Sequence, residues 1–260
     1  MINTGMSSKT NADFNFLFDI FNITALIDLD VIFNTPGKEA RIKNRSFTTA
    51  AADPNLVALW KFNETSGSTT ADSSGHGWTG TLASSPNTPS WNSSGKEGYC
   101  LNFANLGSVT VSDDVVSSIN NRITLTFWAY GNAGEPQMHA NFFIYGASGG
   151  IIQASLVWDS AAKVLWLANS SWADQILKDI TDSTWTECYW NHWAFTKNTS
   201  TGYMRIYHNG SEWHSGTGLT RTISGANASS CNVGSYISGQ YSYDGRDGQC
   251  SSIQQGIDIR

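Results

Sequence analysis

The chain has 260 residues, of which 40% are hydrophobic and only 14% are charged. About a quarter of the residues in a typical soluble domain are charged, and here Ser, Thr, Asn and Gly fill the polar positions, as is typical of β-rich proteins with many turns. The net charge of −6 and the lack of a Lys/Arg cluster argue against nucleic acid and disfavour acidic polysaccharides as ligands. The chain contains no run of eighteen apolar residues, so the sequence predicts no transmembrane helix.

The first segment with a clear pattern lies between Phe14 and Phe33. Odd positions from Phe21 to Phe33 are apolar and most even positions are polar, which predicts one long strand with an apolar face. From Phe14 to Ile20 the alternation has the opposite phase, so a bulge or bend is expected at Ile20–Phe21. Pro36-Gly37 ends the run. A helix is the alternative, but β-branched and aromatic residues at period two argue against it.

A strand with an exposed apolar face needs a partner, because a lone strand is not stable in water. Residues 1–53 are therefore predicted to form a β arm that pairs either with its own domain or with a neighbouring subunit, and residues 54–260 to form the main domain. The predicted assembly-strand residues are Phe21, Ile23, Ile27, Leu29, Val31 and Phe33.

The main domain opens with an apolar strand at Leu56–Phe62, a turn at Asp72–Gly77 and a second strand at Thr79–Leu82. Further apolar segments follow in order at Ile123–Tyr130, His192–Thr196, Tyr203–Gly210 and Gly256–Arg260. Together these segments resemble a laminin-G-like module of the concanavalin A-like lectin/glucanase class, over Leu56 to Arg260.

The resemblance implies an all-β, two-sheet antiparallel jelly-roll sandwich used for extracellular or cell-surface recognition and adhesion. It implies buried tryptophans at Trp60, Trp128 and Trp193. It also implies that Gly256–Arg260 starts a closing strand, so that the arm could fill an edge left open by a short C-terminus.

Catalysis is not favoured by the residue pattern. Glycoside hydrolysis needs two carboxylates across the sugar, whereas the six glutamates are scattered over unrelated elements. A polysaccharide lyase would find its nearest constellation in Arg205, Tyr207 and His208, but period two places His208 on the face opposite the other two. Ser148 stands in a Gly-x-Ser-x-Gly string, yet apolar runs on both sides favour a hairpin over the strand–turn–helix of a nucleophile elbow.

The turn Asp72–Gly77 offers a carboxylate, hydroxyls and carbonyls, which are the oxygen ligands that Ca²⁺ takes. By resemblance, Asp258 of the closing strand would lie nearby, and both aspartates are candidate ligands for a structural calcium ion. The alternative is a plain Asx-turn, in which Asp72 binds its own backbone.

Sugar binding is suggested by eleven tryptophans, since an exposed ring offers a flat face for sugar C–H groups. The loop-placed candidates are Trp78, Trp91, Trp172, Trp213, Tyr236, Tyr241, Tyr243 and Arg246. The alternative for each ring is that it fixes a long loop.

Four cysteines allow three pairings, and Cys231–Cys250 is favoured over a pairing with Cys100 or Cys188 because it would close the Tyr-rich loop. Four free thiols in a cytosolic protein are the alternative. Eight Asn-x-Ser/Thr triplets are candidate glycosylation sites: Asn22, Asn44, Asn63, Asn92, Asn169, Asn198, Asn209 and Asn227.

The sequence therefore predicts a non-catalytic surface module for glycans or matrix proteins that self-associates through its N-terminal strand. A monomeric carbohydrate-binding lectin-like module and a polysaccharide lyase are the alternatives.

Overall fold

The structure is a computed structural model that divides into two compact units, Met1–Ala52 and Asp53–Arg260. It describes residues 31–34, 39–42, 53–103, 107–131, 142–146, 149–156, 163–169, 172–185, 188–237, 240–242 and 251–259. Side chains are described for those between 53 and 234, apart from 142–146, 149 and 150. Within the described residues, no helix is long and apolar enough to cross a membrane.

In the first unit, strand β1 (Val31–Asn34) pairs antiparallel with β2 (Glu39–Ile42) of the same chain. Val31 and Phe33 of the predicted assembly strand lie on β1, which ends two residues before Pro36. The other assembly residues, Phe21, Ile23, Ile27 and Leu29, lie outside the described residues.

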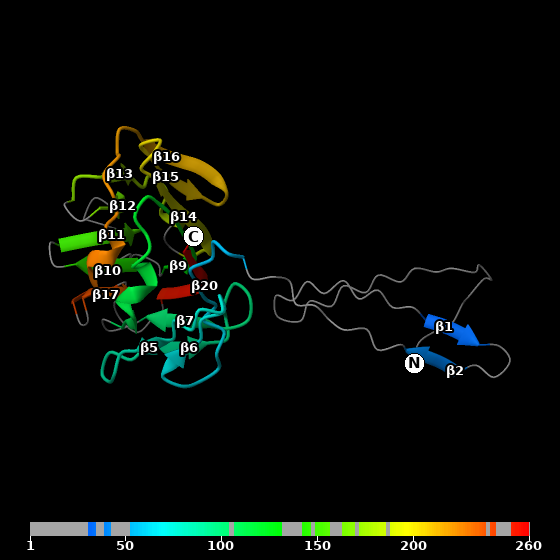
Figure 1. Cartoon of the computed structure of the whole chain (residues 1–260). Helices are drawn as coiled ribbons and strands as arrows, with labels where there is room; N and C mark the ends of the chain where they lie inside the picture. Colours follow the sequence, from blue (N-terminus) through cyan, green and yellow to red (C-terminus); the bar gives the residue numbers. More distant parts are fainter. Residues whose placement is uncertain are drawn as a thin grey trace. The chain divides into compact units, whose positions relative to one another are not determined.

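The second unit is built from two antiparallel sheets, most of whose strands are labelled in Figure 1. Among the described residues, the first sheet has eight strands in the spatial order β13 (Gln175–Asp179), β12 (Lys163–Ala168), β11 (Gly149–Ser155), β10 (Phe142–Gly146), β17 (Ala228–Val233), β8 (Val109–Val111), β5 (Gly80–Leu82) and β4 (Thr69–Thr70).

The second sheet also has eight strands among the described residues. Seven follow the order β16 (Ser211–Gly216), β15 (Tyr203–His208), β14 (Asn191–Asn198), β9 (Arg122–Tyr130), β20 (Ser251–Ile259), β7 (Cys100–Phe103) and β6 (Ser90–Asn92). The eighth, β3 (Ala58–Trp60), pairs with β20. The remaining elements are a hairpin of β18 (Ser235–Ile237) and β19 (Gln240–Ser242), and the 3-10 helices η1 (Asp113–Val116), η2 (Ser183–Trp185) and η3 (Gly225–Asn227).

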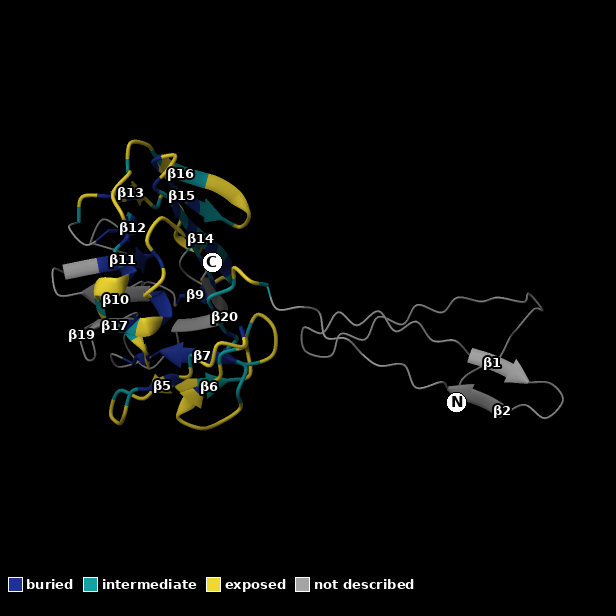
Figure 2. Cartoon of the chain, viewed as in Figure 1, coloured by how far each residue is buried: buried dark blue, intermediate teal, exposed yellow. Residues whose placement is uncertain are grey.

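The strands form because apolar residues recur at period two. Along β9 and β14 every second residue is buried, and the residues between them are half-buried or exposed. β12 is instead buried at every position after its first residue, whereas most turns are exposed and no residue of the edge strand β16 is buried (Figure 2). One face of each strand therefore contributes to the core.

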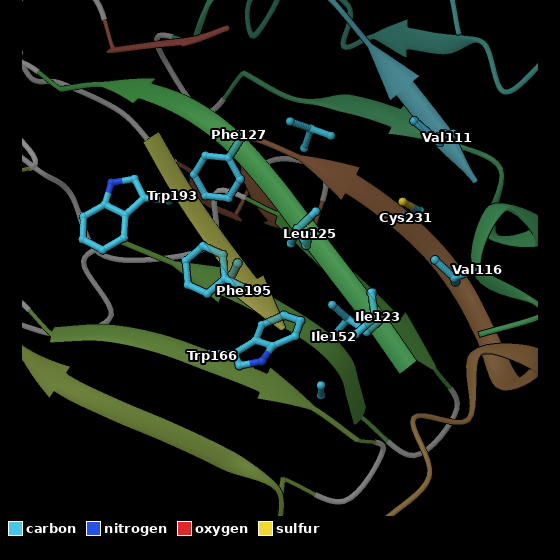
Figure 3. Packing of buried hydrophobic residues seen from close by; sticks show 14 of the residues in the cluster. Val111, Val116, Ile123, Leu125, Phe127, Ile152, Trp166, Trp193, Phe195 and Cys231 are labelled. Atoms are coloured by element: carbon cyan, nitrogen blue, oxygen red, sulfur yellow. The ribbon is translucent and has the colours of Figure 1, made fainter. Parts of the chain in front are cut away.

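The inward faces of the two sheets pack on each other. Trp166 of β12 reaches across from the first sheet, where its Nε1 donates to the carbonyl oxygen of Thr196 in β14 at 3.0 Å. The ring of Phe195 lies 5.5 Å from Trp166 and 5.7 Å from Phe127, centroid to centroid (Figure 3). Trp60 and Trp193 are fully buried, as predicted. The two-sheet sandwich is confirmed.

The closing strand differs from the prediction. β20 runs from Ser251 to Ile259 in the interior of the second sheet, with β9 along one edge and both β7 and β3 along the other. Both of its edges are therefore paired within the chain, and the idea that a short closing strand leaves an edge for the arm is wrong. The local sequence could not show this, because the partners of β20 are more than a hundred residues away.

Two hairpins follow the sequence closely. β10 and β11 pair with Gly146 opposite Gly149, so a strand follows β10 where a nucleophile elbow needs a helix; Ser148 itself lies outside the described residues. Asn209-Gly210 connects β15 to β16 with positive φ angles of 47° and 83°. Two such residues are typical of the tight type I′ hairpin turn.

The predicted disulfide Cys231–Cys250 is wrong, because Cys231 is a free thiol. Cys231 lies opposite Val111 in the β17–β8 register and its side chain is fully buried among core residues (Figure 3). Burial raises the pKa of this thiol, so it stays protonated. Cys188 is a free, exposed thiol, Cys100 is buried in β7, and Cys250 lies outside the described residues.

Candidate functional site

The prediction that Trp128 belongs to the core is wrong. Ile123, Leu125 and Phe127 are the inward residues of β9, so Trp128 falls in the outward phase with Tyr130 and is half-buried. The outward position of Trp128 could have been predicted from the sequence, because the alternation of apolar residues with Thr124 and Thr126 assigns Trp128 to the polar face.

Trp128 is part of a group of aromatic side chains on the outer face of the second sheet. Its ring lies 5.1 Å from that of His192 on the neighbouring strand, and Tyr130 lies 5.6 Å from Trp190. Tyr189, which precedes Trp190 in the chain, is 59% exposed. We call Trp128, Tyr130, Trp190 and His192 the outer aromatic strip.

A cation lies beside this strip. Lys96 belongs to the turn between β6 and β7, which is closed by a hydrogen bond of 3.0 Å from the amide of Gly95 to the carbonyl of Gly98. The Lys96 ammonium lies 4.7 Å from the centroid of the Trp128 ring, a cation–π geometry. Burial lowers the pKa of His192, so this ring is neutral at pH 7. The flat rings of the strip therefore lie beside a hydrogen-bond donor, the ammonium group of Lys96.

Asn191 fixes the segment that carries Tyr189 and Trp190. Its side-chain Nδ2 donates to the carbonyl of Thr184 at 2.9 Å and to that of Tyr189 at 3.2 Å. Its Oδ1 accepts from His208 Nε2 at 2.7 Å and from Asn209 Nδ2 at 3.1 Å. Because Asn191 is 4% exposed and its amide is fully used, it ties the start of β14 to the β15–β16 turn.

Three of the predicted loop tryptophans are half-buried against the core: Trp78, Trp91 and Trp213. The carbonyl of Trp78 accepts from Trp60 Nε1, and Trp91 Nε1 donates to the carbonyl of Gly67 at 2.9 Å. These contacts favour the alternative reading, in which large rings fix loops.

The remaining predicted glycan contacts are spread over other places. Trp172 is half-buried with a positive φ of 57°. The register of β18 and β19 places Tyr236 opposite Tyr241. Tyr243 and Arg246 lie outside the described residues. Their role in sugar binding stays a prediction.

Asp72 acts as the centre of its own turn. Its Oδ1 accepts from the amides of Leu59 at 3.0 Å and Ser74 at 2.8 Å. Its Oδ2 accepts from the hydroxyl of Ser74 at 2.7 Å and the amide of Trp78 at 3.1 Å. Burial alone would raise the pKa of Asp72, but these hydrogen bonds outweigh it and hold the pKa below its usual value.

These four donors use the four lone-pair positions of the carboxylate, so the geometry at Asp72 fits an Asx-turn better than a calcium site. Within the described part of the chain, no group of three His, Cys, Asp or Glu side chains could hold a metal. Asp258 lies in β20 opposite Leu59 and Thr126. Calcium binding stays a prediction, and an unchanged melting temperature in excess EDTA would remove it.

The lyase constellation is used for structural contacts. Arg205 Nε lies 3.2 Å from Glu212 Oε2. His208 is stacked between the rings of Trp185 and Trp193, at 4.4 and 4.6 Å. Burial lowers the pKa of His208, so it is neutral at pH 7. As predicted, Arg205 and His208 belong to opposite phases of β15, so they do not share a site.

The candidate glycosylation sites differ in exposure. Asn169 is 3% exposed and its Oδ1 accepts from the amides of Ala173 and Asp174, so its assignment as a glycosylation site is wrong. Asn227 is exposed in η3, and Asn209 is exposed with its amide bound to Asn191. Asn63, Asn92 and Asn198 are half-buried and accept backbone N–H groups, while Asn22 and Asn44 lie outside the described residues.

Several solved structures share the fold of this chain. Domain 4 of AbnA, a GH43 extracellular arabinanase from Geobacillus stearothermophilus, in complex with arabinotriose, matches with a TM-score of 0.54 and 22% identity, over 79% of this chain and 93% of that one. The binding domain of botulinum neurotoxin DC in complex with rat synaptotagmin II matches with a TM-score of 0.52 and 13% identity, over 80% of this chain and 48% of that one. The same toxin domain in complex with SialylT gives 0.51 and 14%, over 79% and 46%. This chain thus spans about half of the toxin binding domains.

No curated protein matches the chain in sequence. Residues 103–246 match the laminin-G family described as the concanavalin A-like lectin/glucanases superfamily. That segment is more than half of the chain and contains β8 to β19 with the outer aromatic strip. The chain therefore belongs to the laminin-G-like family of the concanavalin A-like lectin/glucanase superfamily.

Proposed function

We propose that this protein is a non-catalytic carbohydrate-binding module whose ligand lies on the outer aromatic strip. The observation that carries the proposal is the half-buried Trp128 with His192, Tyr130 and Trp190 around it on the outer face of a regular sheet. Aromatic faces on rigid strands are pre-organised, so little conformational entropy is lost when a sugar stacks on them.

The solved relatives support a binding function. The arabinanase domain was solved with a trisaccharide, and the toxin binding domain with a protein receptor and, separately, with SialylT. A glycan is favoured here over a protein because the strip combines flat rings with the Lys96 ammonium and with polar side chains. The scattered carboxylates and the separation of Arg205 from His208 support a function without catalysis.

An extracellular or cell-surface location belongs to the same proposal, because glycans are displayed there. Self-association through residues 1–52 is a separate part of it. Because β1 already pairs with β2 of its own chain, a neighbouring subunit would have to pair with the other edge of β1 or of β2, or replace one of these strands.

Titration calorimetry with arabinotriose, cellotriose and sialyllactose tests the binding site. Trp128→Ala and Tyr130→Ala are expected to weaken binding of the recognised sugar by about tenfold or more, as for aromatic side chains at the centre of other binding sites. Tyr203→Ala is the matched control, since Tyr203 is 40% exposed on β15 and lies outside the strip. Equal affinities for wild type and Trp128→Ala would contradict the proposal.

A further inference from the structure

One buried polar atom on the face of the strip has no hydrogen-bond partner. Asn102 on β7 is 5% exposed, and its Oδ1 has no donor within reach. Its Nδ2 donates to the hydroxyl of Ser90 on β6 at 3.3 Å. A buried acceptor without a partner is rare in folded proteins, because its lost hydration is not replaced. Such a group points to a missing ligand.

The register places Asn102 in line with the outer aromatic strip. Leu101 and Phe103 are the core-facing residues of β7, so Asn102 belongs to the outward phase. Asn102 lies opposite Ser252 on β20, and Ser252 lies opposite Tyr130 on β9. Cross-strand neighbours share a face, and two strand spacings are about 9.5 Å. Asn102 and Tyr130 therefore lie on one row across three strands.

The other unpartnered buried atoms of the described residues lie elsewhere. Gln153 Oε1 and Ser108 Oγ belong to the first sheet and the segment leading into it, and Trp193 Nε1 is in the core. Of the four, Asn102 is thus the one on the outer face of the second sheet. Its position next to the strip is a second observation, independent of the aromatic rings.

We propose that Asn102 Oδ1 is the specificity-determining acceptor of the glycan site. It takes a hydrogen bond from a hydroxyl of one sugar while another sugar of the same ligand stacks on Tyr130 and Trp128. The ligand is then an oligosaccharide of at least two linked sugars that runs across β9, β20 and β7. This inference rests on the proposed function. It adds the direction in which the ligand runs across the sheet and the polar contact that the ligand makes.

The buried state of Oδ1 explains why this contact would discriminate. Oδ1 is shielded from solvent, so a hydrogen bond from a ligand hydroxyl to it forms away from water. A site built around a buried polar group strongly rejects a ligand that leaves the group unpaired. Ligands without a hydroxyl at this point are therefore expected to bind poorly.

The test compares Asn102→Leu with Gln153→Leu, which removes an unpartnered oxygen from β11 of the other sheet. Affinity for arabinotriose, cellotriose and sialyllactose is measured by calorimetry, and stability by thermal melting. For the trisaccharide that wild type binds, Asn102→Leu is expected to lose about tenfold in affinity. Its melting temperature stays equal or rises, because an unsatisfied acceptor is gone. Gln153→Leu keeps wild-type affinity.

The outcomes separate the two proposals. Wild-type affinity in Asn102→Leu, together with loss of binding in Trp128→Ala, overturns this inference and leaves the proposed function intact. Failure of wild type to bind any of the three sugars overturns both. If Asn102→Leu does not fold, Asn102→Ala takes its place in the same comparison, and equal affinity there overturns the inference.

Discussion

At the scale of single residues, a buried ion pair is the contact that the sequence analysis missed. Lys197 continues the inward phase of Trp193 and Phe195 on β14 and is only 2% exposed. Its Nζ lies 2.9 Å from Asp174 Oδ2 and also donates to the carbonyl of Ala168. Burial lowers the pKa of Lys197, and the hydrogen bond and charge of Asp174 oppose this shift. The pair joins β14 of one sheet to the β12–β13 connection of the other.

Removing the lysine should leave a buried carboxylate without its partner. We expect Lys197→Met to lower the free energy of unfolding by about 3–5 kcal/mol, because Asp174 loses its buried cation and keeps only the exposed Arg221 side chain 3.7 Å away and the Arg221 amide as partners. Urea unfolding followed by tryptophan fluorescence measures this. Arg221→Met is the control, since Arg221 approaches the same carboxylate at 3.7 Å with a side chain that is 63% exposed. A loss below about 1 kcal/mol is expected there, and an equal loss in both variants would contradict the account.

Asp72 should make the fold sensitive to acid. Burial opposes the charged form, but the hydrogen bonds from Ser74, Leu59 and Trp78 hold the pKa of Asp72 in the folded chain below its ordinary value of 3.8. Its contribution is therefore complete above about pH 3.8 and is lost as the pH falls through the lower, folded pKa. Asp72→Asn cannot accept from both Trp78 and Ser74 at the former Oδ2, and we expect a loss of about 2 kcal/mol at pH 7. Urea unfolding at pH 7 and pH 3 tests this, and a loss of the same size at both pH values would be inconsistent with it.

At the scale of elements, the β15–β16 turn is set by two residues in the left-handed region. Gly210 has a φ of 83° and Asn209 a φ of 47°. A Cβ at position 210 would meet open space, so only the backbone conformation opposes a side chain there. Gly210→Ala is expected to cost about 1 kcal/mol, measured as a lower melting temperature. Gly210→Asn, which tolerates this region, should cost less, and the reverse order would argue against a type I′ turn.

The strands themselves were predictable, because β9, β14 and β15 each carry a period-two pattern of apolar residues. The face of the sheet on which a side chain lies was partly predictable too, since the same pattern assigns Trp128 to the outer face. The neighbours of β20 and the buried position of Cys231 were not, because both depend on which distant strands pair. Lys197 could not be foreseen either, since its partner Asp174 comes from a separate loop.

At the scale of the whole molecule, three half-buried histidines should govern stability near neutral pH. Burial is the largest cause of the lowered pKa of His192, His208 and His214. As the pH falls through about 6.5, the pKa of histidine in the unfolded chain, these residues therefore bind fewer protons in the folded chain than in the unfolded chain. The contribution of the neutral histidines to the free energy of unfolding is expected to be complete above that pH, and the free energy of unfolding is expected to fall as the pH drops from 6.5 towards 5. Melting curves across this range measure the effect, and a flatter curve is expected for His192→Gln with His214→Gln.

The two units of the chain have separate expected roles. Self-association predicts that the full chain forms particles much larger than its mass of 28.3 kDa, and that a chain without residues 1–52 remains a monomer. Light scattering of both proteins at the same concentration measures this. Identical masses for the two proteins would show that the arm is not the assembly element.

The central claim is that the outer aromatic strip binds sugar, and one titration tests it most directly. Wild type, Trp128→Ala and Tyr203→Ala are titrated with arabinotriose, cellotriose and sialyllactose under the same conditions. The account predicts that wild type and Tyr203→Ala bind one of these sugars with equal affinity and that Trp128→Ala binds it about tenfold more weakly or worse. Binding that survives in Trp128→Ala, or no binding of any sugar by wild type, would contradict it.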